Sequence, residues 1–409
     1  MGESNSQFST SESNSSTNSE KKTSGMENGT ENYFTPTIQS EHATLDAANP
    51  EQPAANSTYI VESNENGTYN IFNELTNQVI FSNTDGKQAI EVALANLTPD
   101  RTWKETVILR GNISGVYNIV IPSYTRIIGE GANLCIADNE TSIFEIPTIT
   151  NNTIDVEMEG INFIGNPTTQ DTALLMYKVV NGSYVGVDNF SLRLSRFANF
   201  GTALYLFAIA SQISGNTFTN CQNSIILAND HGSIVENNFF NLARNDETIA
   251  YGLQVIDSNS LKIVNNAFSG EKGNSVGIVC DAQFVDSVII GNTFNKVSRV
   301  AISFGPTERP PEYLILNNVV SGNTFSEMQN GVALEVGFTT PVDTLIFSGN
   351  TFRNINTVLR IGKEGANIAN TNILFTNNIA TTVQTLNITN GASCNAVIKN
   401  NLINGNWIP

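Results

Sequence analysis

A six-residue pattern that recurs along the chain constrains the fold more than any other feature of the sequence. It reads ISGNTF at Ile213–Phe218, and seven further copies follow it, begun by Val235, Ile263, Ile289, Val320, Phe347, Leu374 and Val397. Each copy places asparagine between apolar residues. Self-similarity of this kind indicates a solenoid, in which each repeat is one structural unit that buries its apolar face against the next.

The residue that ends each copy measures the length of the repeat. The intervals run from 22 residues, between Phe218 and Phe240, to 31 residues, between Phe294 and Phe325. The repeats carry strand-type segments without helical periodicity, which disfavours leucine-rich, ankyrin and tetratricopeptide arrays. We therefore predict an all-β fold, a single-stranded parallel β-helix with three short strands in each coil. The marks are Phe163, Phe190, Phe218, Phe240, Phe268, Phe294, Phe325, Phe352, Ile379 and Leu402.

The asparagine of each copy is predicted to occupy the same corner of every coil. Stacked on its equivalents above and below, the amide can donate and accept hydrogen bonds along the axis, and so satisfy groups that would otherwise be buried unpaired. The aliphatic residues before the asparagine and the phenylalanine after it are expected to point inward.

Three segments are expected along the chain. Residues 1–57 are rich in Ser, Thr, Asn and Glu and are predicted to be a disordered polar leader. Residues 58–110 are predicted to hold small strands and a capping helix that begins at Asp85, whose Gln88 completes a capping-box pattern. Residues 111–409 are predicted to form the β-helix, with Trp407 packing against its far end.

Charge and composition narrow the classes of partner. The net charge is −18, with 20 Lys+Arg against 38 Asp+Glu, so the basic clusters that bind nucleic acid are not expected. No apolar run is long enough for a transmembrane helix. None of the four cysteines forms a Cys-x-x-Cys pair, which argues against a zinc site.

From about Thr68 onward the chain resembles the pectate-lyase-like right-handed parallel β-helix proteins. The resemblance rests on TDGKQAIEVALANL, which looks like the capping helix, on VILRGNISGVYNIVIPSYTRIIGEG, which looks like the first coils, and on the GNTF corners. The resemblance implies a right-handed coil. It also implies a role among polysaccharide lyases and hydrolases, phage tailspikes or non-catalytic surface proteins, because these motifs specify architecture and not activity.

Catalytic members of that superfamily place their residues on one outer strand face. Alternation along the strand before each asparagine corner assigns outward positions to Tyr205, Gln254, Asp281, Ser303, Glu335 and Arg360. Asp257 and Asn229 end their strands. A catalytic set would be Asp257, Asp281, Glu335 and Arg360, with Asp281 and Glu335 two coils apart, near the separation of an inverting glycosidase pair. Solvated carboxylates on an acidic protein are the plainer interpretation.

The predicted carbohydrate-binding residues are two tyrosines and two amides: Tyr177, Tyr205, Asn229 and Gln254. The tyrosine rings would offer faces for sugar stacking. The sequence motifs of polygalacturonases are incomplete in this chain, since NDHG around His231 and RIGK from Arg360 match them only in part. Arg299 is read as a turn residue.

The acid run DVEME carries Asp155, Glu157 and Glu159, which alternation places outward, with Val156 and Met158 inward. A weak Ca²⁺ site there is the one cofactor that the sequence suggests, against the plainer interpretation of a solvated acidic face.

The leading hypothesis is therefore an extracellular or cell-surface β-helix that binds or presents to glycans without catalysis. The alternatives are a polysaccharide lyase or glycoside hydrolase acting in an outer groove, and a structural rod or tailspike component that forms a homotrimer.

Overall fold

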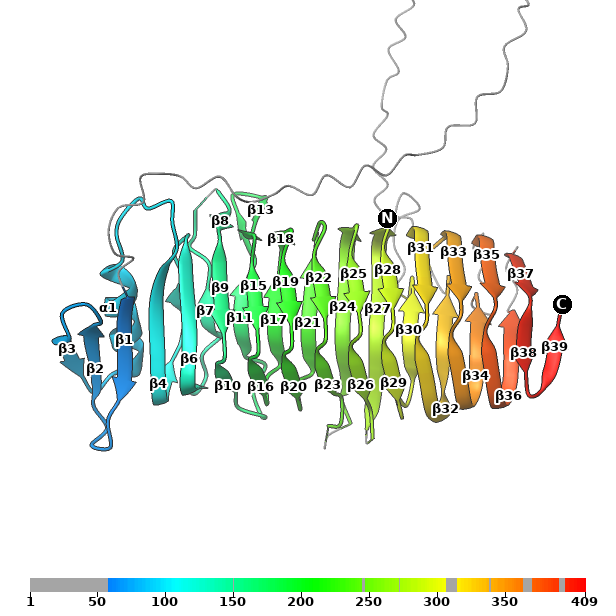
Figure 1. Ribbon diagram of the computed structural model, residues 1–409, viewed down its shortest axis with the longest axis horizontal. Coiled ribbons are helices and arrows are strands. Elements are labelled where there is room, and N and C mark those ends of the chain that lie inside the picture. Colours follow the sequence, from blue (N-terminus) through cyan, green and yellow to red (C-terminus); the bar gives the residue numbers. More distant parts are fainter. Residues whose placement is uncertain are drawn as a thin grey trace, which may run out of the picture. The chain divides into compact units, whose positions relative to one another are not determined.

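The structure is a computed structural model that describes residues 58–409 apart from 150, 245–246, 272, 307–314, 338–339, 363–369 and 390–393. The leader predicted for residues 1–57 lies outside this range. The described chain winds into a parallel β-helix, so the predicted fold class is confirmed (Figure 1). No helix in the described part is long and apolar enough to cross a membrane.

The coils form three faces, which we name A, B and C. Face A holds β5 (Ile119–Val120), β7 (Ser142–Glu145), β11 (Thr172–Met176), β17 (Thr202–Leu206), β21 (Asn223–Ala228), β24 (Ile249–Asn259), β27 (Asn274–Val285) and β30 (Val300–Phe304). Face B holds β1 (Thr58–Ser63), β4 (Glu105–Val116), β6 (Thr125–Ile136), β9 (Val156–Glu159), β15 (Ser191–Arg193), β19 (Gln212–Ser214), β22 (Ile234–Glu236), β25 (Lys262–Val264), β28 (Val288–Ile290), β31 (Ile315–Ser321), β33 (Val342–Ser348), β35 (Asn370–Thr376) and β37 (Cys394–Lys399). Face C holds β10 (Asn162–Ile164), β16 (Arg196–Ala198), β20 (Thr217–Thr219), β23 (Phe239–Asn241), β26 (Ala267–Ser269), β29 (Thr293–Asn295), β32 (Thr324–Val336), β34 (Thr351–Ile361), β36 (Ile379–Thr389) and β38 (Asn401–Ile403).

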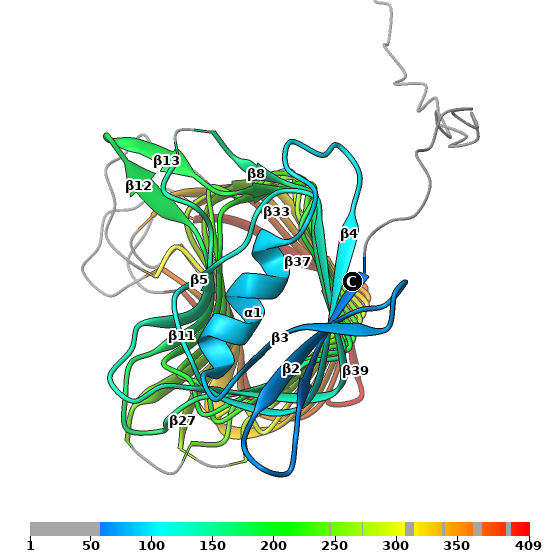
Figure 2. The ribbon, with the colours of Figure 1, turned by 90° about the vertical axis from the view of Figure 1, so that its left-hand side faces the viewer.

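Some strands run past these boundaries or lie outside them. β32 and β34 turn the corner from face C to face A, because their C-terminal halves pair with β30 and β36. The short strands β8 (Thr153–Ile154), β14 (Val187–Asp188) and β18 (Ala208–Ile209) pair between faces A and B. β12 (Lys178–Val180) and β13 (Ser183–Val185) form a hairpin that projects from the coils (Figure 2).

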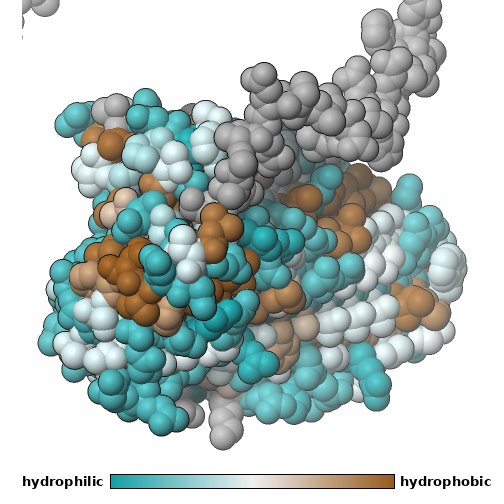
Figure 3. Space-filling view, turned by 60° about the vertical axis from the view of Figure 1, so that its left-hand side comes forward, coloured by the Kyte–Doolittle hydropathy of each residue, from teal (hydrophilic) through white to brown (hydrophobic). Residues whose placement is uncertain are grey.

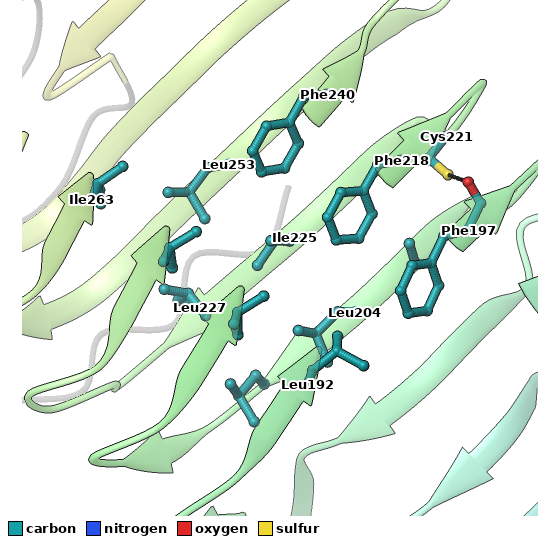
Figure 4. Packing of buried hydrophobic residues seen from close by; sticks show 14 of the residues in the cluster. Leu192, Phe197, Leu204, Phe218, Cys221, Ile225, Leu227, Phe240, Leu253 and Ile263 are labelled. Carbon is teal, nitrogen blue, oxygen red and sulfur yellow. Dashed lines mark hydrogen bonds between the residues drawn. The ribbon is translucent and has the colours of Figure 1, made fainter. Parts of the chain in front are cut away.

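A column of phenylalanines fills the interior behind face C. Successive rings stack with centroids 4.5 to 5.0 Å apart, which matches the spacing of the coils. Figure 4 shows three of these rings among buried leucines and isoleucines. The members are Phe163, Phe197, Phe218, Phe240, Phe268, Phe294, Phe325 and Phe352.

Three of the predicted marks are wrong. Phe190 is buried but immediately precedes β15 on face B, and the column passes through Phe197 instead. At the C-terminal end the inward residues are Ala380 and Ile403, because they continue the register of Phe352. Ile379 and Leu402 therefore face outward, one position from the interior.

The predicted asparagine ladder is confirmed over eight coils. Each of the first seven side-chain amides donates to the amide oxygen of the next asparagine at 3.0 to 3.1 Å. Each also donates to a backbone carbonyl of a neighbouring coil. The ladder comprises Asn216, Asn238, Asn266, Asn292, Asn323, Asn350, Asn378 and Asn401, all of them at most 2% exposed.

The residue before each ladder asparagine has a positive φ, between 55° and 69°. Glycine adopts this left-handed conformation readily because it has no Cβ to approach the next carbonyl oxygen, and asparagine tolerates it because its short polar side chain can hydrogen-bond locally. The sequence repeats this requirement with Gly215, Asn237, Asn265, Gly291, Gly322, Gly349, Asn377 and Asn400. The glycine of GNTF thus sets the backbone conformation, and the asparagine satisfies the buried polar groups.

Substitution of Gly322 separates this backbone requirement from packing. A Cβ at Gly322 would meet no atom closer than 4.0 Å, so sterically there is room for a side chain. We expect Gly322→Ala to lower the free energy of unfolding by about 1 kcal/mol. Gly322→Asn should cost less, because asparagine occupies the equivalent position in four other coils. Urea denaturation of the two variants checks this order, and equal losses would contradict it.

The predicted helix forms as α1 (Gly86–Ala95) and lies across the N-terminal end of the solenoid in Figure 2. Asp85 is its N-cap and accepts a hydrogen bond from the backbone N–H of Gln88 at 3.1 Å. The second half of the predicted capping box is absent, because the Gln88 side chain accepts from Asn83 and the Asp85 N–H donates to the Asn83 side chain. The apolar face expected of the helix is buried: Ile90, Ala93, Leu94 and Leu97.

The predicted N-terminal strands form an antiparallel meander of β1, β2 (Tyr69–Asn73) and β3 (Gln78–Asn83). β1 also pairs in parallel with β4, so the meander continues face B. The boundary expected between residues 110 and 111 falls inside β4.

The prediction that Trp407 packs against the C-terminal end is wrong. β39 (Asn406–Ile408) pairs antiparallel with β38, which places Trp407 opposite Leu402. Because Leu402 faces outward, Trp407 does too, and it is 62% exposed. Ile408 packs against the core instead.

Candidate functional site

One outward row of side chains runs along face A, as predicted. Backbone register connects each residue to its equivalent in the next coil. The row reads Tyr205, Ile226, Gln254, Val279, Ser303, Glu335 and Arg360. Five of the six predicted outward residues lie in it. Asp281 is the sixth, and it lies two residues beyond Val279 on the same strand.

Two adjoining pockets open over the C-terminal half of this row. The first has a volume of about 310 Å³ and is lined by Tyr251, Gln254, Asp281, Ser303 and Glu335, among others. The second, of about 440 Å³, is lined by Glu335 and Arg360. Arg299, Val300, Pro306 and Glu335 line both pockets, so we treat the two as one groove. The structure thus brings three of the four predicted catalytic residues, Asp281, Glu335 and Arg360, to one groove.

Glu335 lies at the centre of the groove and is only 6% exposed. One carboxylate oxygen accepts a hydrogen bond from the Ser303 hydroxyl at 2.9 Å, and the other is paired with the Arg360 guanidinium. A buried charge needs such partners, and the pair also fixes the side-chain rotamer. Glu335 therefore presents a rigid, oriented acceptor toward the groove.

The remaining polar groups of the groove come from neighbouring coils. Asp281 is 6% exposed, and its carboxylate accepts from the backbone N–H of Ala282 at 2.9 Å. It lies two coils from Glu335 and two residues further along its strand, so their Cα atoms are about 12 Å apart. Tyr251 and Arg299 were not singled out as site residues. Their outward positions follow from strand register, which the hexamers alone do not give.

Asp257 and Asn229, also predicted as site residues, occupy coil corners. Both have positive φ, 51° in each case, and neither lines a pocket described here. The Asp257 carboxylate accepts a hydrogen bond from the backbone N–H of Gln283 at 3.3 Å. The Asp257 side chain therefore stabilises the bend that follows it.

The predicted aromatic residues form a cluster at the N-terminal part of face A. Tyr177 stacks on Tyr205 with centroids 4.8 Å apart and on Tyr184 of the projecting hairpin at 5.9 Å. The pKa of Tyr177 is raised mainly because its hydroxyl is partly buried, and to a smaller extent by the neighbouring tyrosine hydroxyls. The pKa of Tyr205 is raised for the same reasons. Tyr177 therefore packs against two other rings of the cluster. Tyr184, which sequence reasoning did not single out, is 56% exposed.

The acid run is engaged in ion pairs with basic side chains of adjacent coils. Glu157 pairs with Lys104, Arg126 and Arg193, and Glu159 pairs with the same two arginines. Val156 and Met158 point inward as predicted. A Ca²⁺ site needs several free oxygen ligands, and these carboxylates are already neutralised, so this donor set does not fit the ion. Within the described residues no group of three or more His, Cys, Asp or Glu side chains is placed to hold a metal.

Comparisons by sequence find no match, either among known protein families or among curated proteins. Comparison of structures finds several β-helix proteins. The tailspike of E. coli bacteriophage HK620, solved in complex with a pentasaccharide, is 13% identical with a TM-score of 0.55, and the match covers 78% of this chain and 63% of the tailspike.

Two further structures match over similar lengths. The A-module of a mannuronan C-5 epimerase from Azotobacter vinelandii is 13% identical with a TM-score of 0.50, covering 78% of this chain and 95% of the module. The catalytic unit of an α-1,3-glucanase from Streptomyces thermodiastaticus is 14% identical with a TM-score of 0.50, covering 87% of this chain and 71% of that unit. At these identities the likeness shows the fold alone. With stacked three-faced coils, an asparagine ladder and these structural neighbours, the chain has the parallel β-helix fold.

Proposed function

We propose that the protein binds a glycan in the groove of face A without cleaving it. The observation that carries this proposal is the groove itself, with its acceptor Glu335 oriented by Ser303 and Arg360. Sugars present many hydroxyl groups, and rigid charged acceptors and donors bind hydroxyls with charge-assisted hydrogen bonds. The structural neighbours include a tailspike bound to a pentasaccharide and a glucanase, which supports a glycan as the ligand.

Several features favour binding over catalysis. Both oxygens of Glu335 are engaged within the protein, so a role as orienting acceptor suits it better than proton transfer. The Asp281 carboxylate is likewise engaged, because it accepts a hydrogen bond from the backbone N–H of Ala282. Among the described residues, Asp257 lies at a corner outside the groove.

A glycoside hydrolase or polysaccharide lyase is the second candidate, favoured by the presence of two carboxylates and two arginines in one groove. Asp281 and Glu335 would then be the acid and base. The proposed location is extracellular or at the cell surface.

A glycan array followed by calorimetry on the bound glycan tests the proposal. We expect Glu335→Gln to weaken binding by about 10-fold or more, because a hydrogen bond to a charged group is lost. Gln254→Ala provides a second groove variant if Glu335→Gln does not fold. Asp286→Asn changes an exposed corner carboxylate outside the groove and should bind as the wild type does.

The same samples separate the two candidate functions. Incubation with the bound glycan should release neither reducing ends nor unsaturated products. Release that is abolished by Asp281→Asn or Glu335→Gln would establish the enzyme, and binding to no glycan would overturn the proposal.

Sedimentation equilibrium tests the homotrimer, for which we expect three times the chain mass of 44.3 kDa.

A further inference from the structure

The groove does not end at the edge of face A. A third pocket of about 340 Å³, which we name the corner pocket, lies where the chain turns from face C to face A. Ser298 and Asn330 line both the corner pocket and the larger pocket of the groove. The hollow is therefore continuous from the outward row of face A, across the turn, to the side of the coils.

The corner pocket is polar and holds charges of both signs. Lys296 pairs with Glu271 at 3.0 Å, and Glu327 accepts a hydrogen bond from Asn354 at 2.7 Å. Lys296 and Glu271 are about half exposed in this pair, so screening leaves both free to exchange partners with a ligand. Mixed donors and acceptors suit hydroxyl groups better than they suit a polyanion.

Two residues of this pocket have a positive φ although neither is asparagine or glycine. Six residues of this corner, each three positions after the first residue of its face C strand, have a positive φ: Asn199, Asn220, Lys296, Glu327, Asn354 and Thr382. Asparagine suits that conformation, and Asn220 donates to Asn199 at 2.7 Å in the manner of the buried ladder. Lys296 and Glu327 suit it less, and both line the corner pocket. Long charged side chains stand here at a conformational cost that asparagine would lower.

We infer that the corner pocket is an additional glycan subsite, in which Lys296 and Glu327 contact a neutral hexose oligosaccharide that continues from the groove around the edge of the coils. This inference rests on the proposed function and extends it. It predicts a ligand that crosses the coils at a corner, through a bent linkage or a branch. It also predicts that affinity rises with ligand length until the corner pocket is filled.

The test uses the full chain and a panel of neutral gluco-, manno- and galacto-oligosaccharides from the disaccharide to the octasaccharide. For the wild type we expect longer or branched members to bind about tenfold more tightly than short ones. In the double variant Lys296→Asn/Glu327→Asn this gain should disappear while the affinity for short members stays unchanged. The melting temperature of the variant should be equal to or above that of the wild type, because asparagine relieves the positive φ.

Thr382→Asn is the matched control. It makes the same kind of replacement in the same row of corners, at a residue that does not line the corner pocket, so it should stabilise the protein without changing binding. Gln329→Ala, at an exposed residue of the pocket, replaces the double variant if that protein does not fold.

The outcomes distinguish failure of the corner subsite from failure of glycan binding in the groove. If long and short members bind equally, or if the double variant keeps the gain with length, the corner subsite is wrong and the groove stands. If acidic glycans alone bind, the neutral ligand class is wrong. If no glycan binds, the proposed function fails and the subsite fails with it.

Discussion

Replacement of Asn292 by alanine should lower the free energy of unfolding by about 3–5 kcal/mol. Asn292 lies in the middle of the buried ladder and is 0% exposed. Its amide donates to the Ile263 carbonyl at 2.9 Å and to the Asn323 side chain at 3.1 Å, and its oxygen accepts from the backbone N–H and the amide of Asn266. Alanine would leave these groups unpaired inside the solenoid, where water cannot reach them.

Urea denaturation followed by circular dichroism measures the loss, and hydrogen exchange at the Asn266 N–H reports it locally. Because a solenoid can unfold in segments, the exchange rate should rise most in the coils next to Asn292. Asn133→Ala is the control. Asn133 makes the same amide contacts, to Asn112 and Asn162, on the outer surface. It should cost about 0.5 kcal/mol, and equal losses at the two sites would contradict a special role for the buried ladder.

Replacement of Asp230 by asparagine should stabilise the protein above pH 7. Asp230 is 0% exposed and sits between Ala208 and Ser258 of the adjacent coils, as the pairing of His231 with Ile209 and Asn259 shows. Within the described chain neither carboxylate oxygen accepts a hydrogen bond of normal geometry, and only weak interactions with the hydroxyl and backbone N–H of Ser233 favour the ionised form. Burial raises the pKa of Asp230 to about 7, and the attraction of Ser233 for the ionised form offsets only part of that rise.

The sign of the pH dependence follows from the two pKa values. In the unfolded chain the carboxyl ionises near pH 3.8, and in the folded protein near pH 7. Below about pH 4 the Asp230 carboxyl therefore leaves the free energy of unfolding unchanged. As the pH rises to about 7 it lowers that free energy more and more, and above pH 7 the loss stays constant at about 4 kcal/mol. Asp230→Asn removes this cost without changing the size of the side chain.

Denaturation of wild type and variant at several pH values between 4 and 9 measures the difference directly. The gain from Asp230→Asn should be near zero at the acid end and largest above pH 7. Asp100→Asn, which changes an exposed carboxylate, is the surface control. A gain of the same size at all pH values would mean that packing, and not ionisation, is responsible.

The repeat predicted the solenoid because an asparagine in the same place in every copy has to satisfy the same buried groups in every coil. It misassigned Phe190 because spacing alone does not tell which corner of the coil a phenylalanine follows, and two different corners carry phenylalanines in that part of the chain. The positive φ required at Gly322 and its equivalents was not predicted, although the hexamers show glycine or asparagine at this position in most copies.

The candidate site was predicted in part. Alternation placed Glu335 and Arg360 on the outer face correctly, since inward and outward positions follow from the period of a strand. Asp257 and Asn229 were named from the expected ends of their strands, where the backbone turns with a positive φ and the alternation of inward and outward positions is interrupted. Register between coils, which depends on loop lengths, decided that Tyr251 and Arg299 share the groove with Asp281.

The sequence by itself determined the architecture, since its local repeat is the physical requirement of every coil. Only the tertiary structure decided which side chains meet, namely that Arg126 and Arg193 neutralise Glu157 and Glu159, that Tyr177 stacks on Tyr205, and that Asp230 lies inside. The ion pairs and the ring stacking join residues of adjacent coils, and their pairing depends on how many residues each coil uses to return to the same face. A local sequence pattern does not specify the length of each coil, which becomes known only when the coils are stacked.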